Sequence, residues 1–412
     1  MSTQAPAPPP GAAPEPLEPE PKADLRDPNS WLPTLKVTAG AFLIALVIGA
    51  FVIAFSDDGV IESLRYFFSY PWDFFTRSAD AVWSSYSALV KGAVGSSNAI
   101  ASTLNRSAPL ICAGLGVTLA FRAGLFNIGA QGQLIMGAIC AGYVGFTWDL
   151  PPFLHLLVAL VAGLAGGAIW GGITGFLKAR TGAHEVITTI MFNYLAASVL
   201  IYALGHEAFQ RPGSDNALSP RVDDSATFPT PFGDNFNVHL GVILAILAGV
   251  GVWWLLERST WGFELRAVGA NADASRTAGM SVSKIYTLAM LLAGALAGLA
   301  ATMQVLGNQN SLSQTLPGSI GFDAITVALL GRANPFGILF GALLIGALHA
   351  GAPLMQIEAG VPVQMIDILQ GVILFFLTAD VIVTRLLRVR RTGGVEELAT
   401  ITRSYGGQGA GS

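Results

Sequence analysis

Neutral amide side chains gather where the apolar sequence of this chain is interrupted. One group lies in RAGLFNIGAQGQ (122–133), one amide falls inside a later apolar run, and further polar residues precede GRANPFG (331–337). An amide both donates and accepts hydrogen bonds, so the set suits a neutral hydroxylated or heterocyclic molecule. It predicts a path for a small-molecule solute, lined by Asn127, Gln131, Gln133, Asn193, Asn308, Phe322 and Asp323.

Several of these residues also have a purely structural interpretation. Asn127 can cap the helix that follows it, Asp323 can complement a helix N-terminus, and Asn193 can join neighbouring helices. Arg122 and Arg332 fall at predicted helix ends, where a long side chain reaches polar surroundings without any role in transport. Both interpretations stay open for each residue.

The sequence carries no pattern for catalysis or for a bound cofactor. It lacks the G-x-x-x-x-G-K-[ST] loop that cradles phosphates, and its five histidines are scattered. Cys112 and Cys140 lie in apolar stretches, which favours packing over a disulfide or a metal site. We therefore expect no enzyme activity, no metal and no cofactor on this chain. Without a basic field we expect no nucleic acid partner either.

Composition indicates that lipid surrounds most of the chain. Of the 412 residues, 52% are hydrophobic and 12% are charged, whereas soluble proteins carry about 25% charged residues. Only helices or closed barrels satisfy the backbone inside hydrocarbon, and the apolar runs lack the alternation of barrel strands. The fold class is therefore all-α, a polytopic membrane bundle of about ten helices. We place them at 37–55, 98–121, 127–147, 153–178, 185–205, 239–257, 286–306, 317–331, 336–352 and 362–386.

Two of the apolar runs look shorter than a span. Residues 107–121 precede the polar RAGLFNIGAQGQ segment, and residues 321–330 precede GRANPFG. A helix of about ten residues rises only about half of the ~30 Å hydrocarbon core. Paired, interrupted segments of this kind are the best sequence indication of a transport site.

Basic residues set the expected orientation. Most Lys and Arg, including the C-terminal run Arg385 to Arg391, fall on one side if both termini are cytoplasmic. Residues 1–34 are rich in Pro and predict a disordered cytoplasmic tail. Residues 35–391 would form the transmembrane domain, and 392–412 a flexible cytoplasmic tail.

Three connecting segments stand out in this topology. The aromatic residues of 56–97 suit an extracytoplasmic position at the membrane interface, in contact with lipid. The acidic 206–238 region is an extracytoplasmic loop, either a solvated connection or a docking surface. The segment 257–285 is cytoplasmic, where Asn271 can cap a short helix that Gly279 ends. A short helix below the membrane suits docking of a soluble partner.

Three ordered motifs resemble a known transporter family. PLICAGLGVTLAFRAGLFNIGAQGQLIMGA (109–138), GFELRAVGANADASRTAGMSVSK (262–284) and GFDAITVALLGRANPFG (321–337) are similar to permeases of bacterial ATP-binding-cassette (ABC) importers. The relevant group carries branched-chain amino acids, simple sugars and nucleosides, and nucleoside-type permeases are the most similar. The resemblance covers about 98–385. Gln131 stands where the commonest motif has Glu, which removes one charge.

The resemblance implies a multi-pass protein of the bacterial plasma (inner) membrane, with two halves of inverted topology. It implies three partners: an ABC ATPase subunit that binds the ATP, a second permease that is usually a different chain, and an extracytoplasmic solute-binding protein. It makes 271–279 the helix that couples to the ATPase. The coupling residues would be Gly262, Arg266, Gly269, Asn271, Ala274, Ala278 and Gly279.

The predicted function is therefore import of nucleosides with ATP hydrolysed by a partner. A simple sugar carried by the same machinery is the first alternative. An ion-coupled secondary transporter is the second, and it would require acidic or histidine relays within the spans. The candidates for such a relay, Asp323, Asp367 and Asp380, all lie near predicted ends.

Overall fold

The computed structural model describes the backbone of residues 28–213, 216–233, 236–316 and 318–378, with side chains from residue 39 to residue 376 within these ranges. The described residues from 41 to 378 form one compact unit. The other unit, residues 1–40 and 381–412, contributes only the first turns of α1 to the described chain. The predicted tail 392–412, most of the tail 1–34 and the run Arg385 to Arg391 lie outside the described residues.

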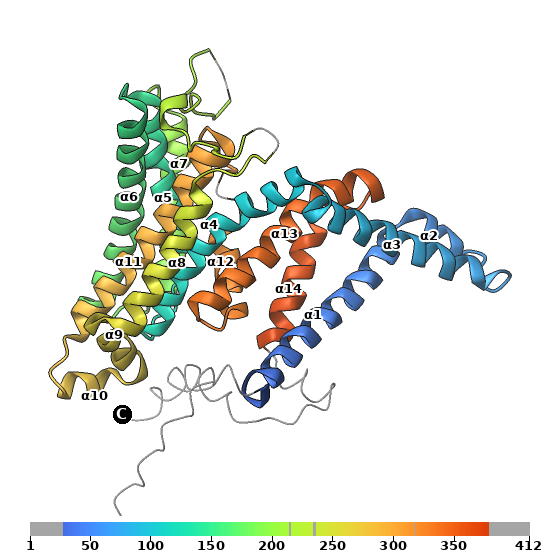
Figure 1. The fold of residues 1–412 in the computed structure, drawn as a ribbon, viewed down its shortest axis with the longest axis horizontal. Helices are drawn as coiled ribbons and strands as arrows, with labels where there is room; N and C mark the ends of the chain where they lie inside the picture. Colours follow the sequence, from blue (N-terminus) through green and yellow to red (C-terminus); the bar gives the residue numbers. More distant parts are fainter. Residues whose placement is uncertain (1–27, 214–215, 234–235, 317, 379–412) are drawn as a thin grey trace, which may run out of the picture. The chain divides into compact units, whose positions relative to one another are not determined.

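The named secondary-structure elements of the described residues are all helices, which confirms the predicted class. The first helices are α1 (Pro28–Ser56), α2 (Asp58–Leu64), α3 (Pro71–Val94), α4 (Ser97–Arg122), α5 (Ala130–Thr147), α6 (Pro152–Thr181) and α7 (Glu185–Leu204). After the loop, with its 3-10 turn η1 (Asp224–Ala226), come α8 (Gly241–Arg258), α9 (Thr260–Ala270), α10 (Ala272–Thr277) and α11 (Val282–Met303). The π-helix η2 (Gln304–Gln309) continues α11, followed by α12 (Ile320–Leu330), α13 (Pro335–Ala359) and α14 (Met365–Thr378) (Figure 1).

Seven of the described helices are long and apolar enough to cross a membrane, and α12 and α14 are shorter apolar helices. Each of the ten predicted segments contains a helix at the expected place. The predicted helix 98–121 is α4, which spans 26 residues and carries Pro109 inside. The short apolar run at 107–121 is the second part of this helix. The interruption at 123–129 is present between α4 and α5.

Glycines bring α5, α6 and α11 into direct backbone contact. A Cβ atom at Gly167 of α6 would overlap the carbonyl oxygen of Gly294 on α11, and one at Gly298 would overlap that of Gly163. Gly137 of α5 packs against Gly163 and Gly298, where α6 and α11 cross. Close backbone approach of this kind drives helix association in lipid, where the hydrophobic effect is absent. These five glycines form what we call the glycine seam.

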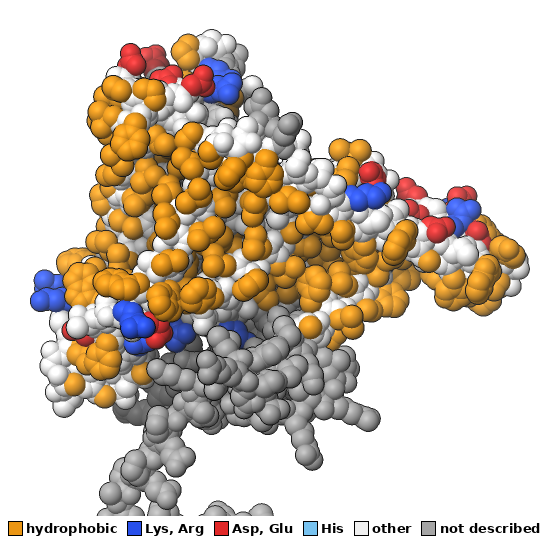
Figure 2. Space-filling view, in the orientation of Figure 1, with side chains coloured by type: hydrophobic (Ala, Val, Ile, Leu, Met, Phe, Trp, Pro, Cys, Tyr) orange, Lys and Arg blue, Asp and Glu red, His pale blue; other side chains and the backbone are white. Residues whose placement is uncertain are grey.

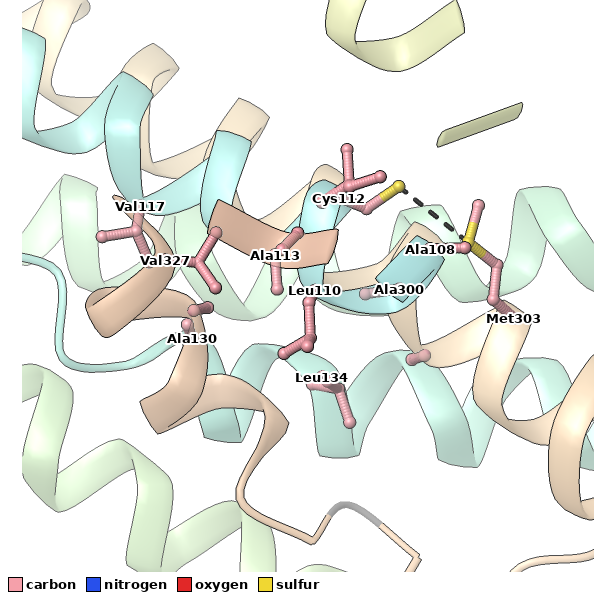
Figure 3. Packing of buried hydrophobic residues seen from close by; sticks show 14 of the residues in the cluster. Ala108, Leu110, Cys112, Ala113, Val117, Ala130, Leu134, Ala300, Met303 and Val327 are labelled. Carbon is pink, nitrogen blue, oxygen red and sulfur yellow. Dashed lines mark hydrogen bonds between the residues drawn. The ribbon is translucent and has the colours of Figure 1, made fainter. Parts of the chain in front are cut away.

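The apolar core beside the seam joins α4, α5, α11 and α12 (Figure 3). Leu110, Leu134 and Val327 pack there, and Cys112 Sγ lies 4.0 Å from Met303 Sδ. Cys112 and Cys140 are both unpaired. Cys112 is buried in this core, and Cys140 is partly buried.

The visible flank of the bundle is covered by apolar side chains, with charged ones gathered toward its ends (Figure 2). Such a distribution suits a protein whose flank faces lipid. Large side chains on α6 and α7, such as Ile169, Met191 and Tyr194, are also exposed.

Residues 56–97 contain the helices α2 and α3, which the sequence analysis did not resolve. The charged residues of α3, Asp73, Arg77, Asp80 and Lys91, recur at helical spacing and share one face. Another face packs on α13, where Gly92 meets the backbone of Gly351. An amphipathic helix is compatible with the predicted interfacial position. The Tyr66 hydroxyl donates a hydrogen bond to Asp73 (2.6 Å), which lowers the pKa of that carboxyl.

Candidate functional site

The loop between α4 and α5 is held by its own amides. Asn127 Oδ1 accepts a hydrogen bond from the Gly129 backbone N–H (2.9 Å), and Asn127 Nδ2 donates to Gln133 Oε1 (3.2 Å). Gly129 is the N-cap residue of α5. Asn127 therefore holds the backbone just before α5, which is close to the capping role that the sequence left open. The side chains of Asn127 and Gln133 are both buried.

Asn193 ties this loop to α7. Its Oδ1 accepts from the Gly132 N–H (2.8 Å) and its Nδ2 donates to the Ile128 carbonyl (2.9 Å). Both amide atoms thus bond to backbone on either side of the N-terminus of α5. Asn193 joins helices, as its structural interpretation expected.

Gln131 connects the first interruption to the second. Its Nε2 donates to the Gly318 carbonyl and its Oε1 accepts from the Gly321 N–H, each at 2.8 Å. A Cβ atom at Gly321 would overlap the backbone of Gln131. The N-terminus of α12 therefore abuts the first turn of α5, and two motifs separated by nearly two hundred residues meet there.

Asp323, in the first turn of α12, sits in a polar cluster with three other side chains. Ser319 Oγ donates to Oδ2 (2.6 Å), Gln370 Nε2 on α14 donates to Oδ1 (2.5 Å), and His349 Nε2 on α13 lies 3.3 Å from Oδ2. Asp323 and Gln370 are both more than nine-tenths buried. We call Ser319, Asp323, His349 and Gln370 the α12 cluster.

Sequence reasoning missed His349 and Gln370. Each is a single polar residue inside an apolar run, and that isolation was the available signal. The sequence analysis placed Asp323 near a predicted helix end. The fold brings an imidazole to its carboxylate.

The structure brings together six of the seven predicted path residues and separates the seventh. Phe322 lies beside Asp323 with its ring half exposed. Asn308 lies in the π-helix, where its Nδ2 donates to Gln304 Oε1 (2.9 Å) and to the Asn105 carbonyl (3.4 Å). Neither contact joins it to the amides around α5 and α12.

The arrangement can exchange hydrogen bonds with a polar solute. Asn127, Gln131, Gln133 and Asn193 all bond to the protein in this conformation, so a solute would have to compete for them or reach them after a rearrangement. Gln370 Oε1 is buried and has no hydrogen-bond partner among the described residues, and an unmet buried acceptor is costly. Among the described residues no group of three or more His, Cys, Asp or Glu could hold a metal ion.

The predicted coupling segment contains two helices rather than one. Ser259 caps α9 by accepting from the Gly262 N–H (2.9 Å), and Gly262 itself packs against the backbone at the end of α8. Arg266 pairs with Glu257 (3.0 Å) across this corner. Gly269, near the end of α9, packs against the backbone of Arg122 and Ala123. The helix α9 was not anticipated.

The short helix α10 has the caps that the sequence predicted. Asn271 Oδ1 accepts from the Ala274 N–H (2.9 Å), and Gly279 has φ +88, in the left-handed region that favours glycine. Ala274 and Ala278 are exposed, while Ser275 faces the protein. The helix thus presents small side chains outward.

A buried histidine holds the 206–238 loop against the bundle. His155 Nε2 lies 3.0 Å from the Val144 carbonyl, which can only accept, so this nitrogen carries the proton. His155 Nδ1 then accepts from the Ser225 hydroxyl (2.7 Å). The loop is therefore anchored to α5 and α6.

Comparison with known proteins identifies relatives of the same kind. Residues 99–378 match the family described as branched-chain amino acid transport system / permease component. A guanosine ABC transporter permease protein of Bacillus subtilis is 42% identical over 74% of this chain and 87% of its own length. A nucleoside ABC transporter permease protein of Lactococcus lactis is 37% identical (74% and 86%), and a glucose ABC transporter permease protein of Haloferax volcanii is 34% identical (68% and 76%). No solved structure matches the chain.

These relatives are transport components rather than enzymes. Together with the long apolar helices, they identify a multi-pass protein of the bacterial inner membrane. A permease component is one part of a transport system that has further subunits. The chain belongs to the family of ABC transporter permeases described as branched-chain amino acid transport system / permease component.

Proposed function

We propose that this chain is the membrane-spanning permease of an ABC importer that moves nucleosides across the plasma membrane. The observation that carries the proposal is the 42% identity to a guanosine permease, which extends over 87% of that relative. ATP would be hydrolysed by a partner ATPase. A second permease, a different chain, and an extracytoplasmic solute-binding protein would complete the assembly.

The proposed solute path passes the meeting point of α5 and α12. Amides there could bond the hydroxyls and ring nitrogens of a nucleoside, and the half-exposed Phe322 ring could stack on its base. The α12 cluster adds a carboxylate and the unmet Gln370 oxygen, which suit a ribose diol because both accept hydrogen bonds. Asn308 would line the same path at a separate position, in the π-helix η2.

The proposed coupling site is the outward face of α10. Its exposed Ala274 and Ala278 leave room for close packing against an ATPase surface. Gly279 and Asn271 fix the ends of the helix, and Gly269 sets its distance from α4. This role requires α10 to be cytoplasmic.

Cysteine labelling tests that orientation. In a background without Cys112 and Cys140, Asp224→Cys should react with an impermeant thiol reagent on intact cells, and Thr277→Cys should react only after the membrane is opened. Both positions are exposed, whereas Ser225 and Ser275 are engaged or buried. The reverse pattern would place α10 outside and end the coupling proposal.

Uptake into vesicles tests the function itself. Vesicles holding the complete transporter should accumulate labelled guanosine when ATP is present on the cytoplasmic side, and an inactive ATPase should abolish accumulation. Uptake driven by an ion gradient without ATP would overturn the proposal.

A simple sugar is the second candidate, favoured by the 34% identity to a glucose permease. Accumulation of labelled glucose, with no competition by guanosine, would establish it instead. The two candidates share the machinery, so only the solute distinguishes them.

A further inference from the structure

The turn between α12 and α13 has an unusual backbone. Arg332 and Ala333 have φ +51 and φ +49. Residues with a Cβ atom rarely adopt this left-handed region, and two in succession persist only where the surroundings hold them. The turn is therefore a strained element directly attached to the C-terminus of α12.

The side chain of Arg122, on the distant helix α4, forms a hydrogen bond to this turn. Arg122, in the last turn of α4, donates from Nε to the Ala333 carbonyl oxygen at 3.1 Å. Within the turn, the Ala333 N–H donates to the Ala328 carbonyl (2.8 Å) and Asn334 caps α13. The carbonyl that Arg122 holds belongs to one of the two strained residues.

The backbone of the same arginine lies against the proposed coupling segment. A Cβ atom at Gly269 of α9 would overlap the Arg122 carbonyl oxygen. A Cβ atom at Gly124, which has φ +74, would lie 3.1 Å from Gly269 Cα. The chain enters α10 two residues after Gly269, at the Asn271 cap.

We propose that Arg122 is a positioning residue that relays movement of the α9–α10 segment to α12. The backbone of Arg122 packs against Gly269, so it should move when Gly269 moves. The guanidinium of Arg122 bonds to Ala333 in the strained turn that ends α12. A shift of α10 would therefore also shift α12, the helix that carries Phe322 and Asp323. This inference rests on the proposed coupling role of α10.

The relay differs from the simpler role of a basic residue at a helix end. A cation there complements the helix dipole or reaches the polar interface, and neither role involves Ala333. A relay through the strained turn should depend on both residues jointly.

The test uses the complete transporter in vesicles. Arg122→Met, which keeps the unbranched stem as far as the position of Nε but removes the donor, should lower ATP-driven guanosine uptake about tenfold, within the range of ordinary coupling energies. ATPase co-purification and basal hydrolysis should persist. Arg180→Met is the matched control, because Arg180 is a last-turn arginine of α6 with an exposed position. Its uptake should stay within about twofold, as for a surface change.

A second substitution separates the relay from a static role in holding the turn. Glycine adopts positive φ without the cost that alanine meets, so Ala333→Gly relieves the strain that a static arginine would offset. A relay needs the guanidinium contact itself, so the double variant Arg122→Met/Ala333→Gly should stay about as low in uptake as Arg122→Met, measured against Ala333→Gly alone. Recovery of uptake in the double variant would overturn the relay, as would full uptake by Arg122→Met.

The same assay distinguishes this inference from the proposed function. If Ala278→Trp uncouples hydrolysis from uptake while Arg122→Met does not, coupling through α10 stands and the relay is wrong. If neither substitution affects coupling, α10 is not the coupling site and the relay falls with it.

Discussion

The glycine seam and the α12 cluster hold helices together in opposite ways. In the seam, the backbones of α5, α6 and α11 touch, because Gly167 and Gly298 leave no side chain between them. In the α12 cluster, α12, α13 and α14 are joined through the side chains of Asp323, His349 and Gln370. Backbone contacts at such distances cannot slide without overlap, whereas side-chain hydrogen bonds can exchange partners.

The lengths of the helices strengthen this contrast. The seam helices α6 and α11 span 30 and 22 residues, whereas α12 has 11 and ends in a strained turn. The seam therefore suits a fixed frame, and α12 suits a moving part that bears the solute path. The predictions below test this difference.

The largest effect is expected at Gly171, one helical turn after the seam residue Gly167 on α6. Gly171→Leu would place a branched side chain against the backbone of Met290 and Gly294. Overpacking typically costs about 1–3 kcal/mol, and more where backbone cannot yield. We expect loss of folded protein from the membrane, measured by yield and by thermal stability in detergent.

The neighbouring Gly172→Leu is the matched control. A Cβ atom at Gly172 makes only ordinary contacts, the nearest at 3.7 Å from Leu291. This variant should accumulate normally. If Gly171→Leu and Gly172→Leu lowered the yield of folded protein equally, α6 would tolerate no added bulk on either side. The seam would then have no special rigidity.

Coupling should be the next most sensitive property. Ala278→Trp adds bulk to the exposed face of α10, so the permease should insert normally while solute-stimulated hydrolysis falls about tenfold or more. Co-purification with the ATPase and hydrolysis in vesicles measure this. Asp149→Trp, at an exposed connection between α5 and α6, is the control. Unchanged coupling in Ala278→Trp would remove α10 from the ATPase contact.

The α12 cluster should respond in function more than in folding. Gln370→Leu removes the donor to Asp323, a hydrogen bond to a carboxylate worth about 1.5–3 kcal/mol. We expect uptake to fall roughly tenfold while the assembled complex is retained, because the seam is untouched. Asp367→Asn, at an exposed position of α14, should leave uptake unchanged. A Gln370→Leu variant that fails to assemble would make the cluster structural.

The smallest effect is expected at the edge of the bundle. Lys91 of α3 lies 3.7 Å from Glu358 of α13, and both side chains are well exposed. Such a pair contributes about 0–1 kcal/mol, so Lys91→Ala should leave thermal stability and uptake nearly unchanged. A large loss would mean that α3 holds α13 by charge rather than by the Gly92–Gly351 contact.

Much of the fold could be predicted because lipid imposes long apolar runs. The ten segments and the caps of α10 at Asn271 and Gly279 follow from local signals. The helix α3 escaped notice because its apolar residues are mixed with charges. The spacing of Asp73, Arg77, Asp80 and Lys91 on one face was the signal that would have found it.

The candidate site was only partly predictable, because tertiary contacts assemble it. Motif position identified Gln131 and Asp323, but not that α5 and α12 meet there. His349 and Gln370 carry no local pattern beyond being polar in apolar runs. The hydrogen bond from Arg122 to Ala333 depends on the positive φ angles of Arg332 and Ala333, which the sequence GRAN does not reveal.

The most direct test of the frame and the moving part is a pair of distances between spin labels. In the background without native cysteines, labels at Phe153 and Leu291 report on α6 and α11, and labels at Phe153 and Phe336 report on the turn after α12. All three positions are exposed. Binding of a non-hydrolysable ATP analogue to the assembled transporter should leave the first distance unchanged and shift the second. A shift in the first distance, or none in the second, would contradict the account.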